Sequence, residues 1–175
     1  MNNNIVILVD ENDKKIGLMD KIEAHQKGLL HRAVSVFIIN SNGEWLLQQR
    51  ALEKYHSPAL WTNTACTHPH PDETNIAAAK RRLLEEMGIS AQLQEIFSFI
   101  YKDQLDENMT EHELDHVFIG ISDDSPNLNK NEVVDYAYIK YEDLVKDVNL
   151  YPEKYTTWFK RIFKKVNDHY KLMNR

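Results

Sequence analysis

Short apolar runs, rich in β-branched and aromatic residues and separated by turn signals, predict a series of strands along the chain. Ser41-Asn42-Gly43 is a strong hairpin turn between two of these runs. The predicted strands cover residues 5–9, 33–39, 44–49, 93–101, 113–121 and 133–141. These strands are expected to form a β-sheet.

Helical periodicity is clearest over residues 75–87, where apolar side chains recur on one face. This stripe consists of Ile76, Ala79, Leu83 and Met87. A short helix is expected over residues 20–27 with Asp20 as its N-cap, and an amphipathic helix over residues 152–170. Because the chain shows no internal repeat or linker, we predict one α/β domain over residues 1–175.

Composition narrows the classes of partner. The chain has 42% apolar and 27% charged residues, a net charge of −6 and no long Lys/Arg run, which argues against a nucleic-acid partner and leaves room for a small anionic ligand. The N-terminus lacks a signal-peptide pattern, and apolar runs such as 34–39 are too short to span a membrane. The single cysteine, Cys66, cannot form an intrachain disulfide, so we expect a cytoplasmic location.

Two carboxylates stand close together at the start of a predicted strand. Glu111 and Glu113 are two residues apart and project from one face, while His112 points away. They repel one another unless a cation or a shared proton compensates. Three histidines beside the edges of predicted elements, His25, His31 and His68, would complete a nitrogen and oxygen shell for Zn²⁺, Mn²⁺ or Mg²⁺. The alternative is a solvated acidic strand end.

Several other polar residues have an ordinary structural explanation. His56 and His70 are in polar loops without a ligand pattern, and His169 is expected on a solvated helix face. Arg82 and Glu86 are four residues apart on the helix, so they form either a surface ion pair or a cation and a carboxylate facing a diphosphate and its Mg²⁺.

The helix belongs to a longer pattern that resembles the Nudix motif, G-x5-E-x7-R-E-U-x-E-E-x-G-U, where U is aliphatic. The matching frame is Thr67, Glu73, Arg81, Arg82, Leu83, Glu85, Glu86, Gly88 and Ile89. Thr67 replaces the first Gly, and Arg82 replaces the Glu that is a principal metal carboxylate in Nudix hydrolases. These departures put ordinary pyrophosphohydrolysis in doubt.

The segment from Trp61 to Pro69 resembles the W-T-N-x-x-C-x-H-P sequence of type 1 isopentenyl-diphosphate isomerases. Further residues match in order along nearly the whole chain. They are Lys21, His25, His31, Arg50, Lys54, the Arg81-Arg82 pair, Tyr101, Glu111, Glu113, Asp135, Tyr136 and Trp158. The resemblance implies a Nudix-like α/β (α+β) fold, with a mixed β-sheet flanked by helices, and reversible conversion of isopentenyl diphosphate to dimethylallyl diphosphate.

The resemblance also implies the layout of the site. The first metal would be held by His25, His31, His68, Glu111 and Glu113. A Mg²⁺ bridging the diphosphate would lie at Glu86, near the backbone of Cys66. The residues that match diphosphate-binding cations are Lys21, Arg50, Lys54 and Arg82. Nothing in the sequence indicates the flavin of the unrelated type 2 isomerases, and the sequence predicts no oligomeric state.

The chemistry needs a proton added at C4 of the substrate and another removed at C2, by groups on opposite faces of the hydrocarbon. Cys66 is expected on one face, and Glu113 with Tyr101 as its partner on the other. Aromatic rings would stabilise a carbocation, and Trp158 and Trp61 are the candidates. Two alternatives remain: a Nudix hydrolase of a nucleoside diphosphate derivative, and a non-catalytic diphosphate-binding module.

Overall fold

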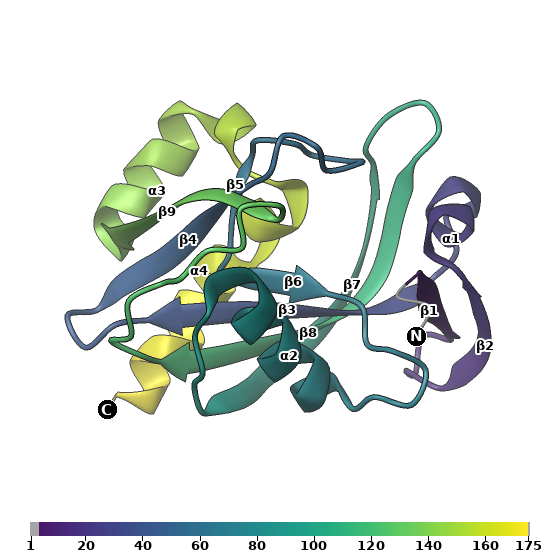
Figure 1. Cartoon of the computed structure of the whole chain (residues 1–175), viewed down its shortest axis with the longest axis horizontal. Helices are drawn as coiled ribbons and strands as arrows, with labels where there is room; N and C mark the ends of the chain where they lie inside the picture. The colour runs from purple at the N-terminus through teal and green to yellow at the C-terminus, as the bar shows by residue number, and fades with distance from the viewer. Residues whose placement is uncertain (1–3, 175) are drawn as a thin grey trace.

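The computed structural model describes residues 4–174, so residues 1–3 and 175 of the predicted domain lie outside the described part. In this range a nine-stranded mixed sheet carries helices on both faces (Figure 1). The strands are β1 (Ile5–Val9), β2 (Lys15–Asp20), β3 (His31–Ile39), β4 (Glu44–Arg50), β5 (Trp61–Thr62), β6 (Ala65–Thr67), β7 (Leu93–Gln104), β8 (Thr110–Ile121) and β9 (Val133–Lys140). The helices are α1 (Lys21–Lys27), α2 (Asn75–Met87), α3 (Tyr141–Leu150) and α4 (Thr157–Met173), with a 3₁₀ turn, η1, over Pro152–Lys154. The predicted mixed sheet flanked by helices is confirmed.

Strand β3 is the centre of the sheet. Along residues 31–39 one of its edges pairs in parallel with β8. Its other edge is shared by β1, by β6 at residues 34–36, and by β4 at residues 38–39. Because β3 and β4 pair only near their hairpin, they diverge, and the segment 61–67 fills the gap with β5 on β4 and β6 on β3. Cys66, in this segment, lines the cavity described below.

The core has two layers, one on each side of the sheet. Alternate residues of a strand face opposite sides, so Val36 packs in the cluster with Leu83 of α2, whereas Phe37 packs in the cluster with Phe159 of α4. The rings of Phe37 and Phe159 are stacked with centroids 6.2 Å apart. In Figure 1, α2 lies in front of the sheet and α4 behind it.

The predicted helix ends at α1 and α2 are confirmed. The Asp20 carboxylate accepts hydrogen bonds from the N–H groups of Ile22 and Glu23, which otherwise lack partners in the first turn of α1. Gly88 ends α2 with a φ of 67°, and a Cβ there would lie 2.8 Å from Asn127. Glycine is therefore required at position 88 both by backbone conformation and by space.

Several boundaries differ from the sequence prediction. The strand β2 and the helix α3 were not predicted, because β2 is a largely exposed edge strand and α3 buries only Leu144 and Val148. Strand β7 continues to Gln104 and β8 begins at Thr110, so this hairpin is longer than its apolar pattern. The C-terminal helix begins at Thr157, after η1, and not at residue 152.

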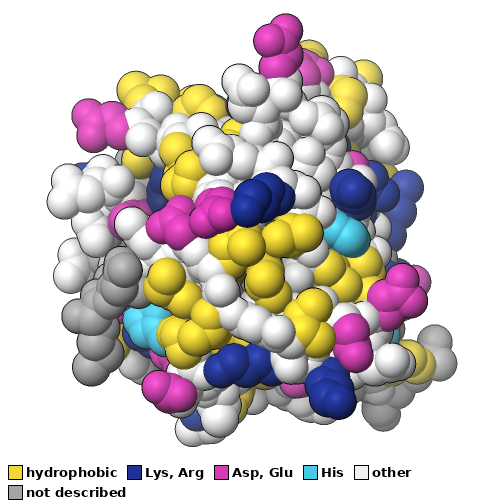
Figure 2. Space-filling model, turned by 90° about the vertical axis from the view of Figure 1, so that its right-hand side faces the viewer, with side chains coloured by type: hydrophobic (Ala, Val, Ile, Leu, Met, Phe, Trp, Pro, Cys, Tyr) yellow, Lys and Arg dark blue, Asp and Glu magenta, His cyan; other side chains and the backbone are white. Residues whose placement is uncertain are grey.

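The face that carries α1, β1 and β2 is a mosaic of apolar and charged side chains. Figure 2 shows hydrophobic side chains gathered across this face between Lys/Arg and Asp/Glu side chains. The exposed large hydrophobic residues of β2 are Ile16 and Leu18. Among residues 4–174, no helix combines the length and apolar character needed to cross a membrane.

Candidate active site

A cavity of about 500 Å³ opens beside the gap between β3 and β4. Most of the residues that the sequence singled out line it, although they come from α1, α2, α4, three strands and two connections. The predicted site residues on its wall are Lys21, Arg50, Lys54, Cys66, His68, Arg82, Glu111, Glu113 and Trp158. The fold thus collects the acid–base candidates and the cations in one space.

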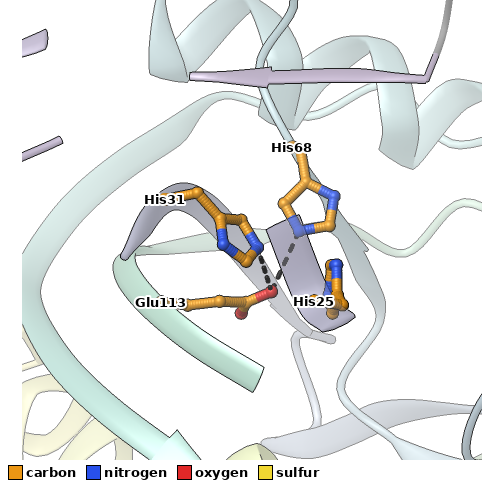
Figure 3. Close-up of side chains that lie close together, drawn as sticks. All are labelled: His25, His31, His68 and Glu113. Carbon is orange, nitrogen blue, oxygen red and sulfur yellow. Dashed lines mark hydrogen bonds and ion pairs between the residues drawn. The ribbon is translucent and has the colours of Figure 1, made fainter. Parts of the chain in front are cut away.

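Three histidines and one glutamate converge at one end of this cavity. His31 and Glu113 are paired across the parallel β3–β8 ladder, while His25 comes from α1 and His68 follows β6. Glu113 Oε1 lies 2.9 Å from His68 Nε2 and 3.5 Å from His31 Nε2, and the four side chains point toward one another (Figure 3). One ligand atom from each lies within 4.8 Å of all the others.

The histidines present unused nitrogens to this cluster. Nδ1 of His25 lies 2.7 Å from the Lys21 carbonyl, and Nδ1 of His31 lies 2.8 Å from the Leu29 carbonyl, so each Nδ1–H donates and each Nε2 keeps its lone pair. Within residues 4–174 neither Nε2 has a hydrogen-bond partner, although both are buried. Two unused Nε2 lone pairs, beside His68 and the Glu113 carboxylate, are compatible with a divalent metal ion.

Tyr101 joins the two carboxylates. Its hydroxyl lies 2.8 Å from Glu111 Oε2 and 2.7 Å from Glu113 Oε2, which confirms that these two glutamates share a face of β8. Burial and the neighbouring Glu113 charge raise the pKa of Glu111. Burial also acts on Glu113, but the imidazoles of His31 and His68 beside its carboxylate outweigh it and hold the pKa of Glu113 well below its usual range. Tyr101 has one hydroxyl proton, and we expect it to go to Glu113, the carboxylate whose pKa is lowered.

Cys66 lies on β6, which pairs with the edge of β3 opposite to β8, and its thiol is hydrogen-bonded to Asn63. The thiol donates a hydrogen bond to Asn63 Oδ1 at 3.3 Å, and the indole N–H of Trp158 donates to the same oxygen at 3.2 Å. Asn63 is itself held by donating to the carbonyls of Val36 and Ala65. Burial, with the charges of nearby carboxylates, raises the pKa of Cys66 to about 12. The thiol is therefore neutral at ordinary pH.

A buried pair of polar residues, Ser35 and Asp115, lies on the strands β3 and β8 next to Cys66. Ser35 is opposite Cys66 in the β3–β6 ladder, and its hydroxyl donates to Asp115 Oδ2 at 2.7 Å. Burial, with the charge of Glu113, raises the pKa of Asp115 well above its ordinary value. The sequence analysis missed Asp115, although its place two residues after Glu113 puts it on the same face of β8.

Another part of the cavity wall carries cationic side chains. Arg82 Nη2 lies 2.6 Å from Glu86 Oε1 and 2.6 Å from Glu132 Oε2, and Lys54 is also ion-paired with Glu132. Because Glu86 is buried and accepts a hydrogen bond from Gln48, the interpretation of Arg82 and Glu86 as a surface ion pair is wrong. Glu132, which the sequence analysis missed, follows a polar turn with no motif that marks it.

Arg50 and the two candidate tryptophans have different surroundings. Arg50 donates hydrogen bonds to the carbonyls of His56 and Ser57, and its guanidinium lies 5.4 Å from the ring centre of Trp158. Trp158 lines the cavity, as predicted. Trp61 packs against the apolar cluster on the α4 side and is outside the cavity wall within the described residues.

His56 was also misjudged from the sequence. It is only 8% exposed, lines the cavity, and places Nε2 3.5 Å from Glu111 Oε1. Its Nε2 and the ligand atoms of His25 and Glu111 form a second group within 4.8 Å of one another. The prediction of a polar loop residue without a ligand pattern is therefore wrong.

Comparison with known proteins agrees with this geometry. The NUDIX domain family matches residues 29–159. An isopentenyl-diphosphate Delta-isomerase of Pectobacterium atrosepticum is 49% identical over 165 residues, covering 94% of this chain and 92% of its own. The chain belongs to the isopentenyl-diphosphate Delta-isomerase family of Nudix proteins. Another member, isopentenyl-diphosphate Delta-isomerase 2 of Aromatoleum aromaticum, is 48% identical over 87% of this chain and 81% of its own.

The fold of this isomerase-family chain is also found in more distant solved structures. The crystal structure of DR0079 from Deinococcus radiodurans superposes with a TM-score of 0.70 at 21% identity, covering 83% of this chain and 89% of its own.

One part of the Nudix-like motif has a structural role here: Arg81 donates two hydrogen bonds, of 2.7 and 2.8 Å, to the Glu73 carboxylate. This bidentate pair braces the turn before α2, and both Arg81 and Arg82 line the cavity.

Proposed function

We propose that the protein interconverts isopentenyl diphosphate and dimethylallyl diphosphate in this cavity. The observation that carries the proposal is the placement of two proton-handling groups on strands that flank β3. Cys66 is on β6 at one edge, and Glu113 with its partner Tyr101 is at the other edge, on β8 and β7. Both Cys66 and Glu113 line the same cavity.

The reaction moves one double bond and needs a proton at each end. One group gives a proton to C4 while the other takes a proton from C2, and the two groups exchange roles in the reverse direction. The thiol of Cys66 starts neutral and the carboxylate of Glu113 starts ionised, so the pair holds one proton between its members. The hydrogen bond from Tyr101 stabilises the charge on Glu113 whenever it is ionised.

The wall beside Cys66 suits a short hydrocarbon that develops positive charge. The Trp158 ring offers a face with a negative quadrupole, and its indole N–H is already bound to Asn63, which fixes the ring plane. Trp61 was a further aromatic candidate; from its position we assign it to packing beside the site.

The diphosphate is proposed to bind among the cationic side chains that line the cavity, Lys21, Lys54, Arg50 and Arg82. Mg²⁺ would accompany it at Glu86. At the histidine end, His25, His31, His68, Glu111 and Glu113 would hold Mn²⁺, Zn²⁺ or Mg²⁺, with Mn²⁺ or Mg²⁺ matching a mixed shell of more than four donors. A divalent ion bound there supplies positive charge that keeps Glu113 ionised and oriented.

A proton NMR assay tests the proposal. Purified protein with Mg²⁺ and isopentenyl diphosphate in D₂O is expected to give dimethylallyl signals and incorporate deuterium. Release of inorganic phosphate or pyrophosphate without isomerisation would support a hydrolase instead. No change, with pyrophosphate still bound, would support a non-catalytic binding module.

Cys66→Ala separates binding from chemistry. We expect this variant to bind inorganic pyrophosphate as the wild type does and to lose isomerisation, because the thiol handles one of the two protons. Near-normal turnover would contradict the role of Cys66. The proposed partner is thus a small isoprenoid diphosphate, and the proposed location is the cytoplasm, which suits a chain with one unpaired cysteine.

A further inference from the structure

The connection between β4 and β5 carries His56 into the cavity. Two residues that follow it, Ser57 and Ala59, have φ values of 48° and 60°, which side-chain-bearing residues adopt rarely. Arg50 holds this turn by donating to the carbonyls of His56 and Ser57, at 3.1 Å each. The backbone is therefore held in an unfavourable conformation that presents the His56 ring inward.

The ring is aimed at the histidine and glutamate cluster by its Nε2 edge. Nε2 lies 3.5 Å from Glu111 Oε1, whereas Nδ1 lies 3.4 Å from the Ser57 hydroxyl of its own turn. The imidazole is stacked on that of His25, with centroids 5.9 Å apart, and is edge-on to Trp158. His56 is thus a neighbour of both His25 in the cluster and the indole of Trp158.

Two sets of donors share one histidine. The first consists of His25, His31, His68 and Glu113, and the second of His25, His56 and Glu111. His25 can serve only one ion, because its Nδ1 is committed to the Lys21 carbonyl and only the Nε2 lone pair is unused. The two sets therefore cannot hold two ions at once through His25, and a single shared ion is the arrangement that uses both sets.

We infer that His56 is an additional ligand of this ion, which is then held by four imidazole nitrogens and two carboxylates. Opposite ligands in a six-coordinate shell are about 4.4 Å apart for bonds of about 2.2 Å. The donors within each set lie within 4.8 Å of one another, close to this separation, and we expect side-chain shifts on metal binding to bring both sets onto one ion. The inference rests on the metal site of the proposed function but not on the isomerase activity.

A complete shell of side chains has a measurable consequence. With His56 bound, all six positions of an octahedral ion are filled by the protein and none is left for water. Without His56, one position opens to solvent. Mn²⁺ reports this directly, because a bound, exchanging water increases the relaxation rate of bulk water protons, and EPR of Mn²⁺ detects coupled imidazole nitrogens.

The experiment uses the full chain, stripped with EDTA and titrated with Mn²⁺. Wild type is expected to show low water-proton relaxivity, and His56→Ala to gain one bound water, lose one nitrogen coupling and bind Mn²⁺ at least about tenfold more weakly. His56→Gln replaces the imidazole by a side chain of similar size, so it tests whether any effect of His56→Ala comes from misfolding. It is also expected to gain a bound water, lose one nitrogen coupling and bind Mn²⁺ more weakly. His70→Ala is the matched control, because His70 lines the cavity but belongs to neither set.

Two results would overturn the inference. If folded His56→Ala and His56→Gln match the wild type in Mn²⁺ affinity, relaxivity and nitrogen couplings, His56 is not a ligand, and the five-residue metal site stands without it. If wild type binds no Mn²⁺, His56 is not a ligand and the metal site of the proposed function fails as well. Isomerase activity, measured separately by NMR, distinguishes these failures from failure of the proposed reaction.

Discussion

Replacing Tyr101 by phenylalanine removes one hydroxyl from the centre of the proposed acid–base group. The ring itself remains supported, because it is stacked on Phe99 with centroids 5.3 Å apart and planes 17° apart. What is lost is the contact of 2.7 Å to Glu113 and the contact of 2.8 Å to Glu111. The change therefore tests hydrogen bonding with little change in packing.

The size of the effect follows from the number of protons available. A hydroxyl has one proton, so only the bond donated to the ionised Glu113 is charge-assisted. Such a bond contributes roughly 1.5–3 kcal/mol. If that stabilisation is present when Glu113 is ionised along the reaction path and lost in Tyr101→Phe, kcat is expected to fall by about 10- to 150-fold.

The assay is the initial rate of dimethylallyl diphosphate formation by NMR, with metal content and thermal unfolding measured on the same sample. Tyr155→Phe is the matched control, because its hydroxyl is hydrogen-bonded to Asp147 away from the cavity wall. We expect the control to retain kcat within about twofold, since surface or peripheral contacts act on stability and not on the reacting atoms. A Tyr101→Phe variant that keeps its fold, its metal and its wild-type kcat would refute the reasoning.

Three further predictions follow from the same geometry. Asn63→Ala leaves the buried indole N–H of Trp158 and the thiol of Cys66 without their acceptor, so urea denaturation is expected to show a loss of roughly 3–5 kcal/mol in unfolding free energy. A loss under about 1 kcal/mol would contradict this. The pKa of Cys66 is raised from 9.0 to about 12 in the folded state, so above pH 9 the unfolded chain loses this proton first. The free energy of unfolding should therefore fall by up to about 1.4 kcal/mol per pH unit between pH 9 and 12, and this slope should be smaller in Cys66→Ala. Glu132→Gln frees Lys54 and Arg82 from their carboxylate partner, so calorimetry should find inorganic pyrophosphate bound several-fold more tightly, by about 1 kcal/mol; weaker binding would mean that Glu132 helps to bind the ligand.

The strongest local signals in the sequence carried through to the structure. The helix over Asn75–Met87 has the predicted bounds, because its apolar stripe and Gly88 act within the segment itself. The two-residue spacing of Glu111 and Glu113 likewise sufficed to put both carboxylates on one face. The sequence pattern was weaker for elements that are stabilised by contacts with distant parts of the chain. Helix α3 buries only two residues, and the edge strand β2 forms by pairing with β1.

The sequence by itself determined which reactive side chains the protein has and which helices and strands carry them, because side-chain periodicity, caps and turns act over a few residues. The resemblance of its motifs to one family added the expected reaction. Only the tertiary structure decided which groups meet. The divergence of β3 and β4 sets Cys66 across β3 from Glu113, and the turn after Arg50 brings His56 to Glu111, 55 positions further along the chain. Such meetings depend on the packing of the whole sheet, which no local pattern encodes.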